Sequence, residues 1–417
     1  MKNIKCLHIL LLLLVAVVFG CSTNPNKANS EKGNQGRSDQ NIGRNKKVLS
    51  DLPTLDFSKE YPKTNITLQD VADVEYVVLE TNNKALLSAF PMYITTNKIV
   101  TYNLEGTISI FDRTGKYLHS FNHKGQSGEE YGDAISIAVD DKEIFVVDFR
   151  RKAIRVYNYQ GKYQRSLKLP ARSVFLSSIY NYDDEFLLGD DKYMIDTGKD
   201  ELINRTPYCK ISKKTGKLIP LPLKFDKRIR DELVAYIDGL NSIGAVFNVS
   251  PIATFDSGGL IADFTLDTAY IYRNDALIPI AVRTNYTSKK GNPIIATVDF
   301  LTDRYQFWIA QEKAIDFKTK ATPEPKFYWI DKTTNNCCEV DLQNSDGVDW
   351  EDVLTSMSVR LSANIHMVPK NCAAQIYKAE MLSQLYSEGK LKGKLKEIAS
   401  KLKEDDNPIL MIAKFKE

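Results

Sequence analysis

The residues with the clearest potential for acid–base chemistry lie in one acidic stretch, YNYDDEFLLGDDKYMIDTGKDE, at positions 180–201. Paired carboxylates can act on a glycosidic bond, and aromatic rings can stack on sugars. The stretch lacks the spacing of a calcium-binding loop. A solvated loop inserted between strands is the alternative that we favour. We assign no catalytic residue here and keep Tyr182, Asp190 and Asp191 as candidate ligand contacts.

A glycine-rich stretch, KGQSGEEYGD at 124–133, is the second candidate. Glycines can let backbone N–H groups surround a phosphate. The stretch has neither the Lys-Ser/Thr pair of a P-loop nor the spacing of a dinucleotide-binding turn, so we interpret it as a structural link between strands. If the fold is a ring of blades, this link lies near the mouth of the central channel. Glu129 and Tyr131 could then contact a ligand.

Two histidines four residues apart, His119 and His123, would share one face if their segment were a helix. The segment reads instead as the end of a strand and a loop, and no third ligand accompanies them. We expect no metal and no cofactor. No local signature of a Ser-His-Asp or Cys-His arrangement is present. Enzyme activity is therefore left open, and we expect binding rather than catalysis.

One strand pattern recurs around these candidate residues. FDRTGKYLHSF at 111–121 and YNYQGKYQRSL at 157–167 share an aromatic start, a central Gly-Lys-Tyr and a Ser-apolar end. Each follows two further alternating runs, at 98–110 and at 142–156, so each unit reads as a meander of about four strands. Glycine at the hairpin tip suits a turn that needs positive φ.

Similar hairpin turns recur along the chain, with second turn residues at Gly115, Gly161, Gly216, Asp275 and Asn335. The steps between them are 46, 55, 59 and 60 residues. Four-stranded repeats of this length are typical of propeller blades. An N-terminal strand within 66–80 and an alternating C-terminal run at 407–415 would complete a sixth blade and leave no open edge. The sequence predicts an all-β, six-bladed β-propeller closed by its N- and C-terminal strands.

A helical insertion interrupts the strand pattern near the C-terminus. In AAQIYKAEMLSQLYSEGKLKGKLKEIASKLKEDD, apolar residues such as Leu382, Leu385, Leu395 and Ile398 recur at three- and four-residue spacing. We expect this insertion to span about 373–404 and to break near Gly389 or Gly393.

The N-terminus has the features of a secretory signal. Lys2 and Lys5 precede an apolar run that is too short for a mature membrane span, and VFGC at 18–21 resembles the bacterial lipobox, in which the Cys is acylated after cleavage. We expect a signal peptide at 1–20, lipid attachment at Cys21, a flexible tether over 21–60, rich in Asn, Ser, Gly and Lys, and the propeller over 61–417.

A lipid anchor would make the membrane the first partner and place the protein in the cell envelope. Because no acidic residues follow Cys21 directly, we expect an outer-membrane lipoprotein that faces the periplasm rather than the exterior. A net charge of +3 with 26% charged residues implies no nucleic acid partner.

The sequence does not decide whether the cysteines of the mature chain form disulfides. Cys209, Cys337, Cys338 and Cys372 could form up to two disulfides, with pairings that the sequence cannot choose, or could be buried thiols. The oligomeric state is also open.

Four stretches of the chain resemble the six-bladed β-propeller lipoproteins of Bacteroidetes, a group related to NHL-repeat propellers. They are LQDVADVEYVVLET, FDRTGKYLHSFNHKGQSGEEYGD, IFVVDFRRKAIRVYNYQGK and EDDNPILMIAKFK. The resemblance covers nearly all of the mature chain and implies the fold but no shared reaction. Relatives often read GQGPGEY where this chain has GQSGEEY. We predict a membrane-anchored, non-catalytic binding or scaffolding propeller for a glycan or envelope protein. The alternative is a polysaccharide hydrolase or lyase with carboxylates at the central channel.

Overall fold

The structure is a computed structural model that describes most of the chain between Leu52 and Lys416. The residues outside the description are 1–51, 84–85, 88–91, 104, 133, 171–175, 177, 191–205, 224–227, 230–231, 237–241, 248–249, 256–257, 348–364, 368 and 417. The predicted signal peptide, Cys21 and Asp191 all lie outside the described residues.

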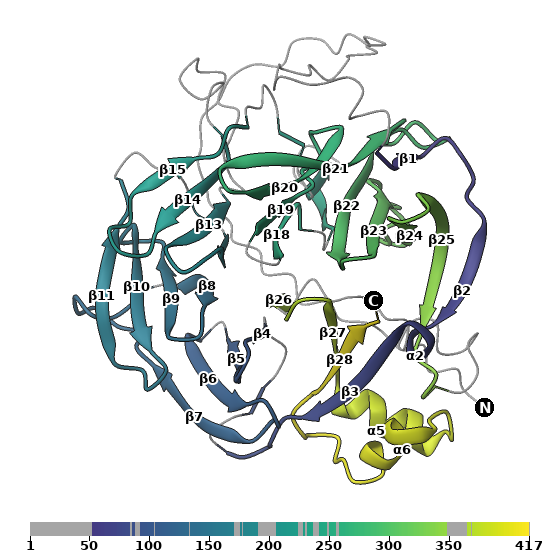
Figure 1. Cartoon of the computed structure of the whole chain (residues 1–417). Helices are drawn as coiled ribbons and strands as arrows, with labels where there is room; N and C mark the ends of the chain where they lie inside the picture. Colours follow the sequence, from purple (N-terminus) through teal and green to yellow (C-terminus); the bar gives the residue numbers. More distant parts are fainter. Residues whose placement is uncertain are drawn as a thin grey trace. The chain divides into compact units, whose positions relative to one another are not determined.

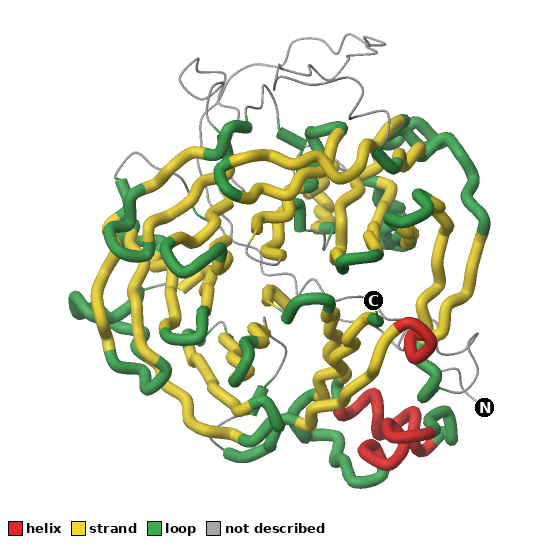
Figure 2. Tube along the Cα trace, in the orientation of Figure 1, coloured by secondary structure: helices red, strands yellow, loops and turns green. Residues whose placement is uncertain are grey.

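Six β-sheets are arranged as the blades of a ring, which confirms the predicted six-bladed propeller (Figures 1 and 2). In the first five blades, four strands follow one another in chain order from the centre to the rim. Their bounds are β4 (Met92–Ile94), β5 (Lys98–Tyr102), β6 (Thr107–Asp112) and β7 (Tyr117–Asn122); β8 (Ala134–Val139), β9 (Glu143–Asp148), β10 (Ala153–Asn158) and β11 (Tyr163–Lys168); β12 (Ser178–Asn181), β13 (Phe186–Asp190), β14 (Tyr208–Ser212) and β15 (Leu218–Pro220); β18 (Ile252–Phe255), β19 (Gly258–Ile261), β20 (Thr268–Arg273) and β21 (Ala276–Thr284); and β22 (Ile294–Leu301), β23 (Tyr305–Glu312), β24 (Lys326–Asp331) and β25 (Asn336–Gln343).

The outer two strands of each of these blades form the hairpin that the turn residues predict. The turn residues all have positive φ, a region open to glycine and tolerated by Asn and Asp. The angles are 89° at Gly115, 78° at Gly161, 76° at Gly216, 58° at Asp275 and 55° at Asn335. The five hairpins are therefore confirmed, each at the rim of its blade.

The shared Gly-Lys-Tyr sequence of the first two hairpins has a structural explanation. The Tyr117 hydroxyl lies 3.0 Å from that of Ser120, and the equivalent Tyr163 and Ser166 hydroxyls are 2.9 Å apart. A Cβ atom on Gly161 would lie only 2.7 Å from the Phe121 ring of the preceding blade. The repeated residues thus form the hairpin and pack it against its neighbour.

The sixth blade combines both ends of the propeller, as predicted. Its strands lie in the order β27 (Cys372–Tyr377), β28 (Ile409–Phe415) and β3 (Ala72–Val78). Every residue of β28 pairs with β3, from Ile409 opposite Val78 to Phe415 opposite Ala72. An N-terminal strand therefore covers what would be the open edge of the last blade.

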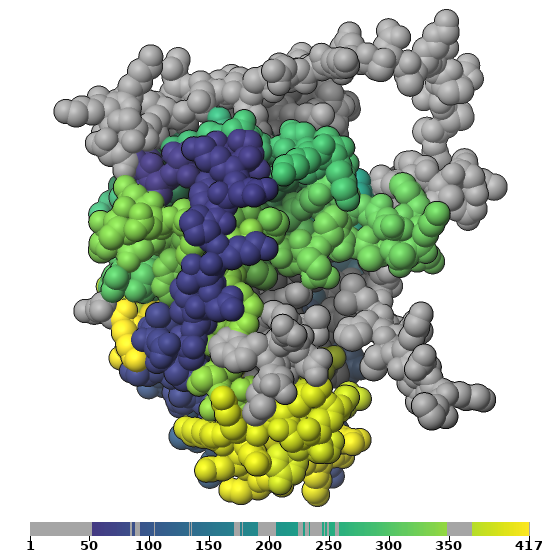
Figure 3. Space-filling model, turned by 90° about the vertical axis from the view of Figure 1, so that its right-hand side faces the viewer, coloured from purple at the N-terminus to yellow at the C-terminus, as the bar shows by residue number. Residues whose placement is uncertain are grey.

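The chain before β3 differs from the prediction. The tether was expected to reach residue 60, but β1 (Thr54–Asp56) pairs in parallel with β21, and Leu55 is fully buried. The expected strand within 66–80 is divided among β2 (Lys63–Thr67), which pairs with β25, the short helix α2 (Leu68–Val71) and β3. Figure 3 shows this purple segment running along the outside of the green blades. The outer strand of a blade has unpaired backbone N–H and C=O groups that can pair with almost any extended segment. A short strand can therefore form there without a strong alternating sequence pattern.

Two helices lie between β27 and β28, namely α5 (Ala379–Ser387) and α6 (Gly393–Ala399). The expectation of an insertion from residue 373 is wrong for its first residues, because they form β27. In the described part of the chain, no helix has the length and apolar character to cross a membrane.

Smaller elements complete the fold. Strands β16 (Glu232–Tyr236) and β17 (Ser242–Val246) form a separate hairpin, and β26 (Ile365–Met367) pairs in parallel with β4. No disulfide joins Cys209, Cys337, Cys338 and Cys372 in the structure. Cys209 and Cys372 are buried, as the thiol reading expects, whereas Cys337 and Cys338 are only partly buried.

Candidate functional site

Long connections gather at one end of the blades. Antiparallel strands alternate in direction, so the links between second and third strands and the links between blades leave the sheets at the same end. This end, called the loop face below, carries the link 123–133 between β7 and β8, the turn 149–152 between β9 and β10, and the connections 313–325 and 378–408. The opposite end has short turns such as 95–97 and 140–142.

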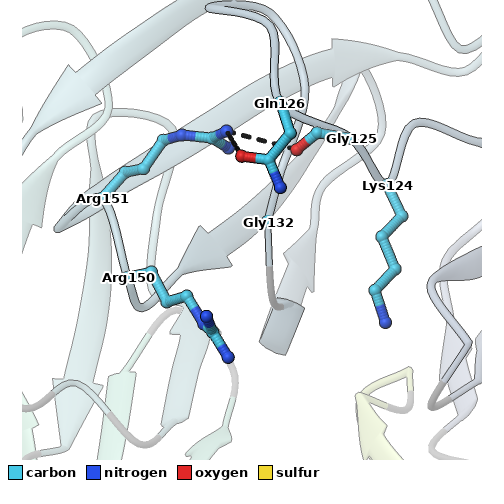
Figure 4. A pocket seen from close by; sticks show the side chains of 6 residues that line it. All are labelled: Lys124, Gly125, Gln126, Gly132, Arg150 and Arg151. Carbon is cyan, nitrogen blue, oxygen red and sulfur yellow. Dashed lines mark hydrogen bonds between the residues drawn. The ribbon is translucent and has the colours of Figure 1, made fainter.

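A pocket of about 500 Å³ opens on the loop face between the glycine-rich link and the β9–β10 turn (Figure 4). Three of the residues around it are cations, and two are glycines that leave backbone exposed. The lining residues are Lys124, Gly125, Gln126, Gly132, Arg150 and Arg151. Among the described residues that line the pocket, none has an acidic side chain.

Arg151 holds the two walls of the pocket together. Its guanidinium forms an ion pair with the fully buried carboxylate of Asp148 at 3.0 Å and donates hydrogen bonds to the carbonyl oxygens of Glu130 at 3.0 Å and Gly125 at 3.2 Å. It also donates to Oε1 of Gln126 at 3.3 Å. Through these hydrogen bonds Arg151 positions the link. The side chains of Lys124 and Arg150 extend away from them in Figure 4.

Tyr131, a predicted ligand contact, is buried. Its hydroxyl donates to the carbonyl of Gly106 at 2.5 Å and accepts from the N–H of His123 at 3.0 Å, and burial raises the pKa of Tyr131 to about 12. The prediction is wrong for this residue, since a side chain with no exposed surface cannot line a binding face. Its role is to fix the link against the first blade.

The two glutamates of the link differ from each other. Glu129 is exposed on the loop face, and its carbonyl oxygen accepts a hydrogen bond from Tyr157 at 2.6 Å. Glu130 folds back over Gly125, where a Cβ atom would lie 2.0 Å from its Oε2. The backbone N–H of Ser127, 2.8 Å away, helps to lower the pKa of Glu130. Contact between Glu129 and a ligand stays a prediction.

Asp190 lies at the end of β13 in a buried cluster. Arg228 Nη2 is 3.0 Å from Asp190, and Arg228 Nε is 3.1 Å from Asp263, which also accepts a hydrogen bond from Tyr208 at 2.6 Å. Burial opposes the charge of Arg228, but attraction by Tyr208 and the two carboxylates holds its pKa well above the ordinary value.

The two described contacts predicted in the acidic stretch, Tyr182 and Asp190, therefore do not form a ligand site. Asp190 is only 3% exposed, so its assignment as a ligand contact is wrong. Tyr182 is also buried, and its hydroxyl donates to the carbonyl of Tyr272 at 3.3 Å, so the prediction fails for it too. Both side chains face neighbours that sequence spacing does not reveal.

The histidines do not form a metal site. His123 Nε2 lies 2.7 Å from the carbonyl oxygen of Gly161, and the ring of His123 stacks on Tyr157 with centroids 5.2 Å apart. Among the described residues, no group of three or more His, Cys, Asp or Glu side chains could hold a metal ion.

Sequence reasoning missed the cations of the pocket. Lys124 opens the glycine-rich link, and Arg150 and Arg151 form an adjacent pair in the β9–β10 turn. The signal that could have found them is two arginines at the tip of a predicted hairpin. Their approach to Lys124 depends on how two blades pack.

The fold and this face define a class: six-bladed β-propellers whose longer loops lie on one end of the ring. The chain belongs to the family described as a domain of unknown function, DUF4934, whose model matches residues 52–414. No curated protein matches the chain in sequence.

Two solved structures are similar to the chain. A Bacteroides fragilis NCTC 9343 protein whose name describes it as exported shares 14% identity and a TM-score of 0.60, over 88% of this chain and 99% of its own. A Bacteroides vulgatus ATCC 8482 member of the DUF4221 family shares 11% identity and a TM-score of 0.47, over 84% and 99%. The first likeness supports the fold alone.

Proposed function

We propose that this protein is a membrane-anchored, non-catalytic binding propeller of the cell envelope, and that its loop face binds a glycan or an envelope protein. The observation that carries the proposal is the gathering of the long connections and the cation-lined pocket on one end of a rigid ring. Loops on a rigid scaffold are the usual carriers of binding function.

The proposed location rests on sequence. VFGC at 18–21 fits acylation of Cys21, and the similar B. fragilis protein is described as exported. The proposal is an outer-membrane lipoprotein that faces the periplasm, with kinship to NHL-repeat propellers as part of the same proposal. Labelling cells with a radioactive fatty acid tests the anchor, because Cys21→Ser should abolish both the label and the recovery of the protein in membranes.

The hydrolase alternative has less support from the described residues. Glycosidases need two carboxylic groups that reach the substrate, one of them a proton donor. Asp190 and Asp263 do approach each other, but one guanidinium binds both, and both are buried. This geometry fits an interblade ion-pair cluster rather than an acid and a nucleophile.

Binding by the full chain in detergent tests the proposed function. The protein is screened against neutral and acidic oligosaccharides and purified envelope proteins, and reducing ends are measured in parallel. Saturable binding with no new reducing ends supports the proposal. Release of reducing ends at a rate that scales with protein concentration would favour the hydrolase.

A further inference from the structure

We propose that the pocket between the link 123–133 and the β9–β10 turn binds the acidic group of a sugar, so that the ligand is a uronate- or sulfate-bearing oligosaccharide. This inference rests on the proposed binding function and names the chemistry of its ligand. The pocket is defined by Lys124, Gly125, Gln126, Gly132, Arg150 and Arg151.

The charges around the pocket favour an anion. Lys124, Arg150 and Arg151 contribute three positive charges. The buried carboxylate of Asp148 lies 3.0 Å from Arg151 and 3.7 Å from Arg155, which is not among the lining residues, so two guanidinium groups share this one carboxylate. Glu130 also lies on the link, but it folds over Gly125 and is held by Ser127. Among the described residues that line the pocket, the charged side chains are therefore all positive.

The architecture favours a preformed site. Arg151 joins both walls through the carbonyl oxygens of Gly125 and Glu130, and the N–H of Gly132 donates to Asp148 at 3.3 Å. Lys124 and Arg150 are exposed, so a ligand can reach them without rearrangement of the link. Binding costs less conformational entropy when the cations that contact the ligand are already in place.

The size of the pocket and an exposed aromatic residue that precedes Arg150 in the chain favour a sugar. A volume of about 500 Å³ falls within the range of small-molecule pockets and exceeds what a lone sulfate or phosphate needs. Phe149 precedes Arg150 in the same turn and is 39% exposed. Aromatic rings stack on the apolar faces of sugars, while a guanidinium pairs with a carboxylate or sulfate through two parallel hydrogen bonds. Together they match a sugar acid better than an acidic peptide.

Isothermal titration of the full chain in detergent tests this inference. The probes are trigalacturonate, a sulfated disaccharide, maltotriose as the neutral analogue, inorganic sulfate and an oligoglutamate peptide. The variants are Lys124→Gln, Arg150→Gln and their combination. Lys142→Gln is the matched control, because Lys142 is an exposed lysine in the turn 140–142 at the opposite end of the same blade.

We expect saturable binding of an acidic oligosaccharide that weakens at least about tenfold in the double variant, since each lost cation removes a charge-assisted hydrogen bond. Lys142→Gln should bind like the wild type. The same melting temperature in the wild type and the variants would show that the loss is not unfolding. If the double variant unfolds, the two single variants supply the comparison.

Other results separate the inference from the proposed function. Three results would overturn the inference but leave the proposed binding propeller. They are equal binding of maltotriose and the acidic oligosaccharide, equal binding of the acidic oligosaccharide by the double variant and the wild type, and binding of sulfate or oligoglutamate without binding of the oligosaccharide. Absence of binding to every probe, to the wider glycan panel and to the envelope proteins would overturn both.

Discussion

The side-chain amide of Asn344 donates a hydrogen bond to the hydroxyl of Tyr76 at 2.7 Å and thereby joins the fifth blade to the strand that closes the ring. Asn344 is buried just after β25, and its Oδ1 accepts from Gln69 at 2.6 Å. The same amide lies 3.4 Å from the Tyr377 hydroxyl on β27. One side chain therefore contacts segments from both ends of the propeller.

Replacement of Asn344 by Ala should destabilise the ring. Buried polar groups that lose their partners cost about 1–3 kcal/mol each, so we expect a loss of roughly 2–4 kcal/mol in the free energy of unfolding. Equilibrium urea denaturation measures it. Asn97→Ala, in an exposed turn, is the control and should unfold like the wild type. Equal stability of the two variants would show that the Asn344 contacts do not hold the closure.

Gly115 should be intolerant of a side chain. Its φ is 89°, and a Cβ atom would lie 2.2 Å from the backbone oxygen of Val78 in the closing strand. Gly291 has a similar φ of 84°, but no atom lies within 4 Å of its Cβ position. Gly291→Ala should therefore cost only the backbone strain of about 1–2 kcal/mol, and Gly115→Ala clearly more. A similar fall in melting temperature for both would argue against the close approach.

Arg228 and Arg304 each bind an aspartate at 3.0 Å, but only the first pair is buried. Arg228→Ala would leave the carboxylates of Asp190 and Asp263 buried without their cation, and we expect a loss of roughly 3–5 kcal/mol. Arg304→Ala breaks an exposed pair with Asp331 and should change stability little. Thermal and urea unfolding of both variants give the comparison. Similar losses for both would contradict a structural role for the Arg228 cluster.

Asp299 should make stability depend on pH. It has no cross-strand partner at the irregularity between Val298 and Phe300 of β22, and desolvation raises its pKa from 3.8 to about 8. A raised pKa means that the folded protein holds the proton after the unfolded chain has lost it. The contribution of Asp299 to stability is thus complete below pH 3.8 and declines as pH rises toward 8.

Asp299→Asn tests this dependence by urea denaturation across that pH range. The variant should gain stability over the wild type as pH rises toward 8. Asp316→Asn is the control, because backbone hydrogen bonds from Thr319 and Lys318 lower the pKa of Asp316. Asp316→Asn should lower the free energy of unfolding rather than raise it, and this loss should stay constant above pH 3.8. A constant difference between Asp299→Asn and the wild type would contradict the raised pKa.

The scaffold was largely predictable because its signals are local. Gly161 and Asn335 specify hairpin turns through φ alone, and the alternating run 409–415 specifies a strand wherever it pairs. The strands β1 and β2 were missed because a few extended residues on an outer edge need no periodic pattern. Their place depends on the free edges of β21 and β25, far along the chain.

The candidate site was only partly predictable. The glycine-rich stretch was correctly interpreted as a link between strands, yet Tyr131 within it is buried and Lys124 at its start lines the pocket. Asp190 was chosen for its charge, but Arg228, 38 residues away, neutralises it. The residue type determines which chemistry a side chain can perform. The neighbouring residues in the fold determine whether that side chain is available to a ligand.

By itself the sequence determined a ring of strand meanders, its closure by both ends and a lipobox-like N-terminus, because turn chemistry, alternation and short motifs are encoded in adjacent residues. Only the tertiary structure decided which charges are buried and paired, and which cations face a pocket. Lys124 lies on the link between the first and second blades and Arg150 in a turn of the second, and their proximity arises from tertiary packing, which no local pattern records.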